Sequence, residues 1–562
     1  MAIGKLKYGA FWFMGTIGLC LIGLLAFYHW VKPDYPVLTQ SDHAHAGVEV
    51  VESGNFRKID NNWLQMNQHG MWELYVEGAP FERGLVYGQL AIQQVQEQEV
   101  YFVDQIKEMV PSEFMLSFLK YFIAWFNRDI DDHIPEEYKK EILGISKVFS
   151  DDYDYIAPKY YRILNYHAAH DIGHALKDLM LVGCTSFANW GPYSEDSTLL
   201  IGRNFDFYVG DDFAKNKLIT FMKPDQGHPF VSVSWGGMIG VVSGMNIRGL
   251  TVTINAARSD IPKGSKTPIS ILAREILQYA STIDEAFEIA KQREVFVSES
   301  LLIGSALDGE AAIIEKGPLK MGLYRPENGQ LICSNHYQSA SLVNDPENVT
   351  NILKSDSKSR FDRMSELLNV QGSLNVKGAV SILRDRYGQD GKDIGLANPK
   401  AINQLLAHHG VVFKPAKRQI WISANPFQLG EFICYDLGKV FQMAPEIDRN
   451  TSITEQDLMI PRDTFLLSKE YADFKYFHAI RKKIIKSTSS GSLLELSKDQ
   501  IDSFIQSNTN SYLTYMYLGD HYRNQDLLDS AFKYYSQSLK HEVASVSERE
   551  NIESLLKECN TD

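Results

Sequence analysis

The sequence predicts a layered α+β domain that follows an N-terminal transmembrane helix and precedes a C-terminal helical appendage. Three observations lead to this class. Residues 8–31 carry no charge, residues 184–445 alternate groups of strand-like runs with helical stretches, and residues 463–562 are mostly helical and charged. The chain has 562 residues, which is too many for one compact core. We therefore expect two or three structural units.

The N-terminal run indicates a membrane anchor. Residues 8–31 contain no Asp, Glu, Lys or Arg, and at 1.5 Å per residue such a helix spans a bilayer core of about 30 Å. Lys5 and Lys7 precede the run, so the positive-inside rule predicts a cytoplasmic N-terminus and an extracytoplasmic (periplasmic or luminal) domain. A cleaved signal peptide is the alternative. The bulky residues 27–30 argue against it, since a cleavage site requires small residues.

Composition excludes some classes of function. The 56 basic and 70 acidic residues give a net charge of −14, which argues against nucleic-acid binding. Five scattered cysteines do not predict a disulfide scaffold. Cys333 and Cys434 could form a disulfide outside the cytosol, and the sequence does not decide this. His167, His170 and His174 share one helix face, which we interpret as a polar surface rather than a metal site. No metal and no cofactor is expected.

The expected units run in order along the chain. Residues 1–32 form the cytoplasmic start and anchor, 33–60 a stalk, 61–183 an N-terminal region, 184–445 the α+β core and 463–562 the tail. In the tail, six residues fall in the register of one tetratricopeptide helix pair: Tyr515, Leu518, Gly519, Tyr522, Ala531 and Tyr535. One such unit cannot bury its own faces, so a packing appendage is favoured over a module that binds a partner protein.

The element boundaries follow from periodicity. Amphipathic patterns predict helices over 81–110, 135–150, 269–279, 282–292, 359–368 and 400–408. Strand-like alternation predicts strands over 184–190, 198–207, 230–235, 249–256, 301–315 with a break at Asp308-Gly309, 331–336, 411–414, 419–423 and 432–437.

The first two of these strands form a hairpin that contains a cysteine. If the polar turn 191–197 is centred near residue 194, paired positions sum to roughly 388, and Cys184 lies opposite Asn204 within one residue. Arg203 and Asp206 then lie beside Cys184. A nearby cation favours the thiolate, which indicates a reactive cysteine. The alternative is a small buried side chain without chemistry.

The hairpin residues also resemble a known family. Gly183-Cys184-Thr185-Ser186-Phe187, followed by Gly202-Arg203-Asn204-Phe205-Asp206, is similar to the start of the catalytic subunit of N-terminal-nucleophile (Ntn) hydrolases. The resemblance is to the acyl-coenzyme A:6-aminopenicillanic acid acyltransferase group, with choloylglycine hydrolases and acid ceramidases as relatives, and it extends over roughly residues 75–440. It implies a four-layer αββα core and self-cleavage between Gly183 and Cys184.

Self-cleavage would give Cys184 its own base. A freed α-amino group has a pKa of about 7.7–8.0 and can take the thiol proton, whereas the amide of the intact chain cannot. The resemblance implies that Arg203 and Asp206 order this amine and thiol. It further implies that Asn255 and Asn335 donate hydrogen bonds to the oxyanion. It matches the family's distal arginine to Arg360, with Arg363 as the alternative.

These inferences predict a membrane-anchored, self-processing amidohydrolase. It would cleave a linear amide of a small amphiphilic N-acyl substrate through a thioester on Cys184, and keep its own N-terminal fragment as a partner. Transfer of the acyl group to an amine is the first alternative. A catalytically dead scaffold that binds a partner protein through the helical tail is the second.

Overall fold

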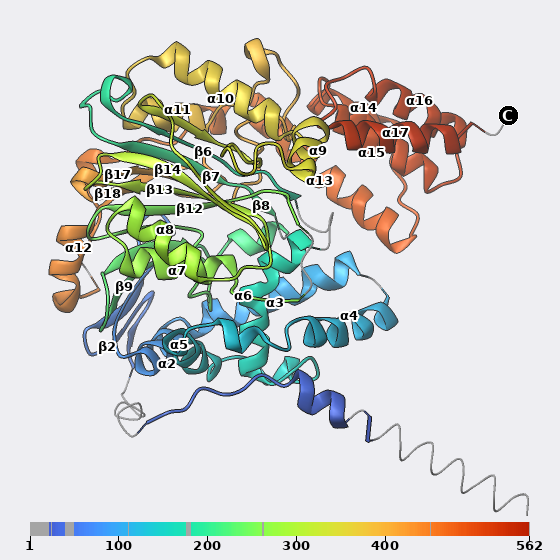
Figure 1. The fold of residues 1–562 in the computed structure, drawn as a ribbon. Helices are drawn as coiled ribbons and strands as arrows, with labels where there is room; N and C mark the ends of the chain where they lie inside the picture. Colours follow the sequence, from blue (N-terminus) through green and yellow to red (C-terminus); the bar gives the residue numbers. More distant parts are fainter. Residues whose placement is uncertain are drawn as a thin grey trace, which may run out of the picture.

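The fold is a stack of two sheets between two layers of helices (Figure 1). The computed structural model describes residues 22–23, 25–39, 50–110, 112–175, 181–208, 210–260, 264–449 and 451–560. Within these residues, one sheet has eleven strands and the other has six. The predicted α+β class is confirmed, and its layers follow the order αββα.

The large sheet is antiparallel except for one parallel pair, β4 with β9. Its strands, in spatial order, are β1 (Val51–Ser53), β2 (Phe56–Ile59), β3 (Asn62–Met66), β4 (Trp72–Gly78), β9 (Leu218–Pro224), β10 (Phe230–Ser234), β11 (Ser243–Asn246), β12 (Leu250–Ala256), β13 (Glu299–Ser305), β14 (Glu310–Lys316) and β15 (Met321–Tyr324).

The small sheet carries the predicted hairpin. Its order is β16 (Gln330–Cys333), β6 (Thr185–Asn189), β7 (Leu200–Phe205), β17 (His409–Lys414), β18 (Gln419–Ser423) and β19 (Phe432–Asp436), and β5 (Leu181–Val182) pairs separately with β8 (Phe207–Tyr208). Ile201 and Val411 of this sheet pack against Phe221 and Leu302 of the large one. Each fully buried side chain of this kind contributes about 1.5–3 kcal/mol.

Helices cover both outer faces of the stack. On the large sheet lie α2 (Pro80–Leu90), α3 (Ile92–Met109), α5 (Glu136–Ser146), α6 (Lys159–Ala175), α7 (Ile269–Tyr279) and α8 (Ile283–Gln292), and α4 (Glu113–Phe126) joins this layer at its end, where Phe126 is buried. The small sheet is covered by α10 (Ser357–Gln371) and α11 (Val376–Leu383), with α9 (Pro346–Lys354) beside α10 and α12 (Leu437–Met443) after β19. Helix α8 begins with a capping box between Thr282 and Glu285.

Two predicted helices differ from the structure. The helix expected over 81–110 is divided at Ala91 into α2 and α3. The helix expected over 400–408 is wrong, because this segment is irregular. The side chains of Asn398 and Asn403 accept hydrogen bonds from the backbone N–H groups of Lys400 and Leu405, and Leu405 has a φ of 54°. Such local bonds compete with the helix ladder.

The N-terminal region is part of the stack. Strands β1 and β2 lie within the expected stalk, 33–60, so the second half of that expectation is wrong. On α5, Glu141 pairs with Arg83 of α2 at 2.5 Å and with Arg274 of α7 at 3.3 Å, and all three side chains are fully buried. Burial acts to raise the pKa of Glu141, but the two guanidinium groups hold it below its usual value. This ion triad joins the regions before and after Cys184.

The C-terminal tail is helical, as predicted, and packs against the stack. It consists of α13 (Lys469–Ser490), α14 (Lys498–Ser507), α15 (Tyr512–Arg523), α16 (Leu528–Ser538) and α17 (Val546–Glu558). Helices α15 and α16 pack closely at Gly519, where a Cβ would lie 2.5 Å from the ring of Tyr535. Leu396, Leu405 and Leu429 of the core share one apolar cluster with the tail. The tetratricopeptide relationship itself stays a prediction.

Most of the predicted anchor falls outside the described residues, which exclude 1–21 and residue 24. Among the helices that are described, none combines the length and the apolar character needed to cross a membrane. The anchor and the extracytoplasmic location therefore stay predictions.

The disulfide left open between Cys333 and Cys434 is not formed. Both cysteines are free and buried. Cys333 lies on β16 and Cys434 on β19, the two opposite edges of the small sheet. Strands lie about 4.8 Å apart, so the two residues are far beyond the Cα separation of less than about 7 Å that a disulfide permits.

We expect Glu141→Ala to lower the free energy of unfolding by about 3–5 kcal/mol, because it leaves two buried guanidinium groups without their carboxylate. Urea unfolding curves would measure this, with both chains carrying Cys184→Ala so that neither can cut itself. Asp473→Ala is the control: it removes the surface pair with Lys469, which is 86% exposed, and should change stability by less than about 0.5 kcal/mol. Equal effects of the two substitutions would contradict a structural role of the triad.

Candidate active site

The predicted hairpin brings the candidate residues together. Strands β6 and β7 pair Thr185 with Asn204 and Ser186 with Arg203, one residue from the predicted register. The turn between them starts at Gly191, which has a φ of 57°. Cys184 directly precedes β6, and Asp206 directly follows β7. The hairpin therefore places Cys184, Arg203 and Asp206 at one end of the small sheet.

Cys184 is a buried thiol that faces a guanidinium group. Its side chain is 1% exposed, and Nη2 of Arg203 donates to its Sγ at 3.6 Å. Burial raises the pKa of the Cys184 thiol to about 11; the charge of Arg203 opposes this shift, and the nearby carboxyl group of Asp206 adds to it. In the continuous chain the thiol is therefore protonated at neutral pH. A base is needed before it can attack a carbonyl carbon.

Arg203 is fixed by neutral partners. Its Nη1 donates to Ser243 Oγ and its Nη2 to the Ile254 carbonyl, both at 2.5 Å, and its guanidinium lies 4.2 Å from the centre of the Phe205 ring. Burial lowers its pKa, but an arginine keeps its charge in proteins. The Arg203 cation thus stands permanently beside the sulfur.

Asp206 has a free acceptor in the same cluster. Burial raises its pKa to about 7, against the charges of Arg360 and Arg203. Its Oδ2 accepts a hydrogen bond of 3.5 Å from Gln404. Within the described part of the chain, its Oδ1 is buried and has no hydrogen-bond partner. Asp206 is therefore able to accept a hydrogen bond from an amine at residue 184.

Arg360 lies against the peptide bond that the resemblance marks for cleavage. Its Nη1 donates to the carbonyl oxygens of Gly183 at 3.0 Å and Cys184 at 2.9 Å, and its Nη2 to Oδ1 of Asn335 at 3.0 Å. The alternative, Arg363, pairs instead with Asp385 at 2.8 Å. The structure therefore places Arg360, and not Arg363, at the site.

The two asparagines lie near the site without touching the scissile carbonyl. The amide Nδ2 of Asn255 donates to the Cys333 carbonyl at 3.1 Å, and that of Asn335 donates to the Ala256 carbonyl at 2.8 Å. In the continuous chain both amides are thus occupied by backbone oxygens. Their role as oxyanion donors during turnover stays a prediction.

Sequence reasoning missed Gln404. Its Nε2 donates to the Gly183 carbonyl at 3.0 Å, and the side chain is 3% exposed. The residue lies in the irregular segment that periodicity assigned to a helix. Local sequence pattern therefore did not reveal which groups surround Gln404, and the only signal was its position five residues before β17.

The histidines that were considered as candidates have structural partners. His167 is hydrogen-bonded on both ring nitrogens, to the Ile163 carbonyl at 2.8 Å and from the Ile239 N–H at 3.0 Å. The side chains of His170 and His174 lie outside the described residues. His409 bonds Ser243 Oγ at 2.8 Å, and this hydroxyl is the one that receives the bond from Arg203. His409 thus supports Arg203 through the Ser243 hydroxyl.

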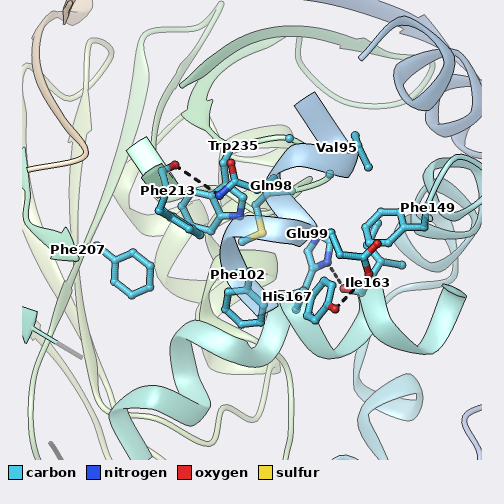
Figure 2. Close-up of a pocket in the computed structure, with 14 residues that line it drawn as sticks. Val95, Gln98, Glu99, Phe102, Phe149, Ile163, His167, Phe207, Phe213 and Trp235 are labelled. Atoms are coloured by element: carbon cyan, nitrogen blue, oxygen red, sulfur yellow. Dashed lines mark hydrogen bonds between the residues drawn. The ribbon is translucent and has the colours of Figure 1, made fainter. Parts of the chain in front are cut away.

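An aromatic pocket begins next to Asp206. Phe207 stacks on Trp235 with ring centres 6.0 Å apart, and Phe213 packs on the same indole at 4.9 Å. Figure 2 shows these three rings on one side of the pocket, and Phe149 and His167 with Glu99 on the other. The remaining lining residues come from α3, α6 and the segment after β10. The pocket is therefore bounded by both the N-terminal region and the core.

Solved structures with overall similarity include two hydrolases. The Caenorhabditis elegans ortholog of N-acylethanolamine-hydrolyzing acid amidase is 15% identical, with a TM-score of 0.30, over 42% of this chain and 93% of that one. The C2A mutant of conjugated bile acid hydrolase from Clostridium perfringens is 13% identical, with a TM-score of 0.33, over 48% of this chain and 95% of that one.

Sequence comparison extends over a larger part of the chain. An uncharacterized protein of Archaeoglobus fulgidus is 26% identical in an alignment of 374 residues that covers 58% of this chain and 60% of that relative. Residues 193–427 match the family model described as acyl-coenzyme A:6-aminopenicillanic acid acyl-transferase, starting nine residues after Cys184. The resemblance to the acyl-coenzyme A:6-aminopenicillanic acid acyltransferase family of Ntn hydrolases, first noted around Cys184, is thereby confirmed.

Proposed function

We propose that the chain cuts itself before Cys184 and then hydrolyses a linear amide bond of an N-acylated substrate. One observation carries this proposal. The Cys184 thiol, the Arg203 cation, the unpaired Asp206 oxygen and the hydrogen-bonded Gly183 carbonyl form a single buried cluster. These are the groups that a self-activating cysteine requires: a nucleophile, a cation for its thiolate, an acceptor for its amine and a polarised peptide bond.

The turnover chemistry follows from this cluster. After self-cleavage the α-amine of Cys184 takes the thiol proton, and the thiolate attacks the carbonyl carbon of the substrate. The C–N bond of the substrate breaks as the ammonium group returns a proton to the leaving amine, and a thioester with Cys184 forms. Water, deprotonated by the same amine, then breaks the C–S bond and releases a carboxylic acid. Arg203 stabilises the sulfur anion in both steps.

Acyl transfer is the alternative fate of the same thioester. If an amine rather than water attacks the C–S carbon, the product is a new amide and the thiol is restored in the same way. The family match supports this alternative, since its description names an acyltransferase. The two reactions differ only in which nucleophile reaches the thioester.

The aromatic pocket is an argument for a substrate whose larger part is an acyl chain. Five of its lining residues carry apolar rings or a thioether, and Phe207 among them directly follows Asp206 in the chain: Phe102, Phe207, Phe213, Trp235 and Met238. Such a surface favours a hydrocarbon chain over a charged group. We therefore propose fatty-acyl amides or acylated amino acids as the substrate class.

A location at a membrane surface is part of the proposal. Helix α4 leaves large apolar side chains in solvent, with Phe114 79% and Phe118 59% exposed. Arg128, just after this helix, lies 5.3 Å from the rings of both Trp125 and Trp30. The exposed face is therefore next to the end of the predicted anchor. This arrangement supports a lipid-proximal site, and we propose that it lies on the extracytoplasmic side that Lys5 and Lys7 predict.

The N-terminal fragment is proposed to stay bound after the cut. Besides the β4–β9 pair, its contacts with the core include Glu141 with Arg274, Asp171 Oδ2 with the Ile269 N–H at 2.8 Å, and His167 with the Ile239 N–H. The scaffold alternative, in which the tail binds a partner protein, predicts an uncut chain.

We expect purified protein to separate on a denaturing gel into fragments of 183 and 379 residues, the larger beginning Cys-Thr-Ser-Phe. Cys184→Ala should remain one chain and lose more than about 10³-fold in amide hydrolysis, because it removes the nucleophile. Cys559→Ala, in the tail, is the matched control and should cut and hydrolyse normally. Equal turnover by Cys184→Ala, or full activity of uncut wild-type protein, would refute the assignment.

We expect Asp206→Asn to stabilise the uncut chain at high pH but not at low pH. Because burial raises the pKa of Asp206 to about 7, folding favours its protonated form, and stability is lost as the pH rises from about 4 to about 7. The neutral asparagine escapes this loss. In a Cys184→Ala background, its advantage in the free energy of unfolding should grow by about 4 kcal/mol between pH 4 and pH 8. If the stability advantage of Asp206→Asn did not change with pH, folding would not shift the pKa of the Asp206 carboxyl group.

We expect Met238→Trp to shorten the acyl chain that the enzyme accepts. Met238 is 4% exposed and lines the pocket, so a larger ring fills space that a long chain needs. With amides of increasing acyl length and product detection by mass, kcat/KM for long chains should fall at least about tenfold, and that for acetyl amides should change little. A uniform loss at every length would contradict an acyl pocket.

A further inference from the structure

We propose that Gln404 acts with Arg360 as the pair of hydrogen-bond donors that stabilises the oxyanion during self-cleavage at Gly183. This inference rests on the self-cleavage in the proposed function and goes beyond it. It assigns a catalytic role in the precursor to a residue that no sequence pattern marked, and it separates the oxyanion donors of self-cleavage from Asn255 and Asn335.

Two side chains converge on one carbonyl oxygen. The Gly183 oxygen accepts from Nη1 of Arg360 at 3.0 Å and from Nε2 of Gln404 at 3.0 Å. Both donors are buried, so water does not compete for the oxygen. One donor is charged and the other is neutral. This is the composition of an oxyanion hole, in which fixed donors strengthen their bonds as negative charge develops on the oxygen.

The residue before the scissile bond must be small for Gln404 to reach it. A Cβ built on Gly183 would lie 2.3 Å from Nε2 of Gln404 and 3.0 Å from its Oε1. Such a contact would displace the amide from the carbonyl. The absence of a side chain at residue 183 therefore serves the hydrogen bond from Gln404.

The donors act on a balanced sequence of bonds. Sγ of Cys184 attacks the Gly183 carbonyl carbon, and the C=O electron pair moves to the oxygen that Arg360 and Gln404 hold. When this oxyanion collapses, the C–N bond breaks, the nitrogen of Cys184 receives the thiol proton, and a thioester remains. Water then breaks the C–S bond, which leaves a carboxylate on Gly183 and restores the thiol.

The segment that carries Gln404 is held from two sides. Within it, Asn403 Oδ1 accepts from the Leu405 N–H at 2.9 Å. From the tail, Asn508 exchanges hydrogen bonds of 2.9 and 3.0 Å with the backbone of Leu396, and the Glu542 carboxylate accepts from Lys400 at 2.6 Å. The donor is therefore fixed before the reaction, which is what makes an oxyanion hole effective.

The first test follows the cut in the full chain after synthesis in a cell-free system, by denaturing gel over time. Gln404→Met keeps the side-chain length but removes the donor, and should slow the appearance of the 183-residue fragment at least about 100-fold. Gln428→Met is the matched control. Gln428 is also fully buried, and its amide has no hydrogen-bond partner in the described structure, so this variant should cut at the wild-type rate. A wild-type rate for Gln404→Met would overturn the inference.

If Gln404→Met has a lower melting temperature than the uncut Cys184→Ala chain, a double-mutant cycle provides the decisive test. Gly183→Ala should slow cleavage strongly when Gln404 is present, because the new methyl group displaces the amide. The same Gly183→Ala substitution should slow cleavage much less in a Gln404→Ala chain, in which the amide is already absent. Additive effects would overturn the inference. Normal cutting by all Gln404 variants, with Cys184→Ala uncut, contradicts this inference alone, whereas an uncut wild-type chain contradicts the proposed function as well.

Discussion

The buried guanidinium group of Arg360 is the interaction on which the organisation of the site depends. Its Nη1 donates to the carbonyl oxygens of Gly183 and Cys184 and its Nη2 to Asn335, and the bond from Nη2 to Asp356 at 3.0 Å provides a carboxylate partner. A charge taken out of water is tolerated only where several acceptors compensate it. The bonds that satisfy Arg360 therefore also fix the path of the chain on both sides of the Gly183–Cys184 peptide bond.

A second buried cation completes the arrangement on the opposite flank of the cysteine. Arg203 faces the sulfur, whereas Arg360 faces the carbonyl oxygens. Both charges act to lower the pKa of Asp206, yet burial outweighs them and the pKa stays near 7. A carboxyl group with this pKa accepts or gives up a proton at working pH, which suits a partner of an α-amine with a pKa of about 7.7–8.0.

The appended regions contribute to the site rather than surrounding it. The tail supports the segment of Gln404 through Asn508 and Glu542, and His478 and Lys482 of α13 bind Asp211 at 3.0 and 2.7 Å. Asp211 begins the short turn that carries Phe213 of the pocket. The N-terminal region supplies the opposite wall of the pocket. An isolated core would therefore lack part of the pocket and part of the support of the segment that carries Gln404.

The sequence by itself determined the hairpin of Cys184, because turn residues and alternation act over neighbouring positions. That local register was enough to place Arg203 and Asp206 beside the thiol, and the family resemblance added Arg360. Helix periodicity likewise found α7 at its observed bounds. The disulfide considered between Cys333 and Cys434 is absent, because spacing along a chain does not determine which sheet edge a strand occupies.

Only the tertiary structure decided the rest. The pairing of β4 with β9 joins residues far apart in sequence, and no local pattern encodes such a contact. The choice of Arg360 over Arg363 depended on which side of α10 meets the Gly183–Cys184 peptide bond. Gln404 was hidden because asparagine side chains replaced helix bonds around it and distant tail residues held the segment in place. Local periodicity reports which face of an element is apolar, whereas packing between distant elements determines which polar groups meet.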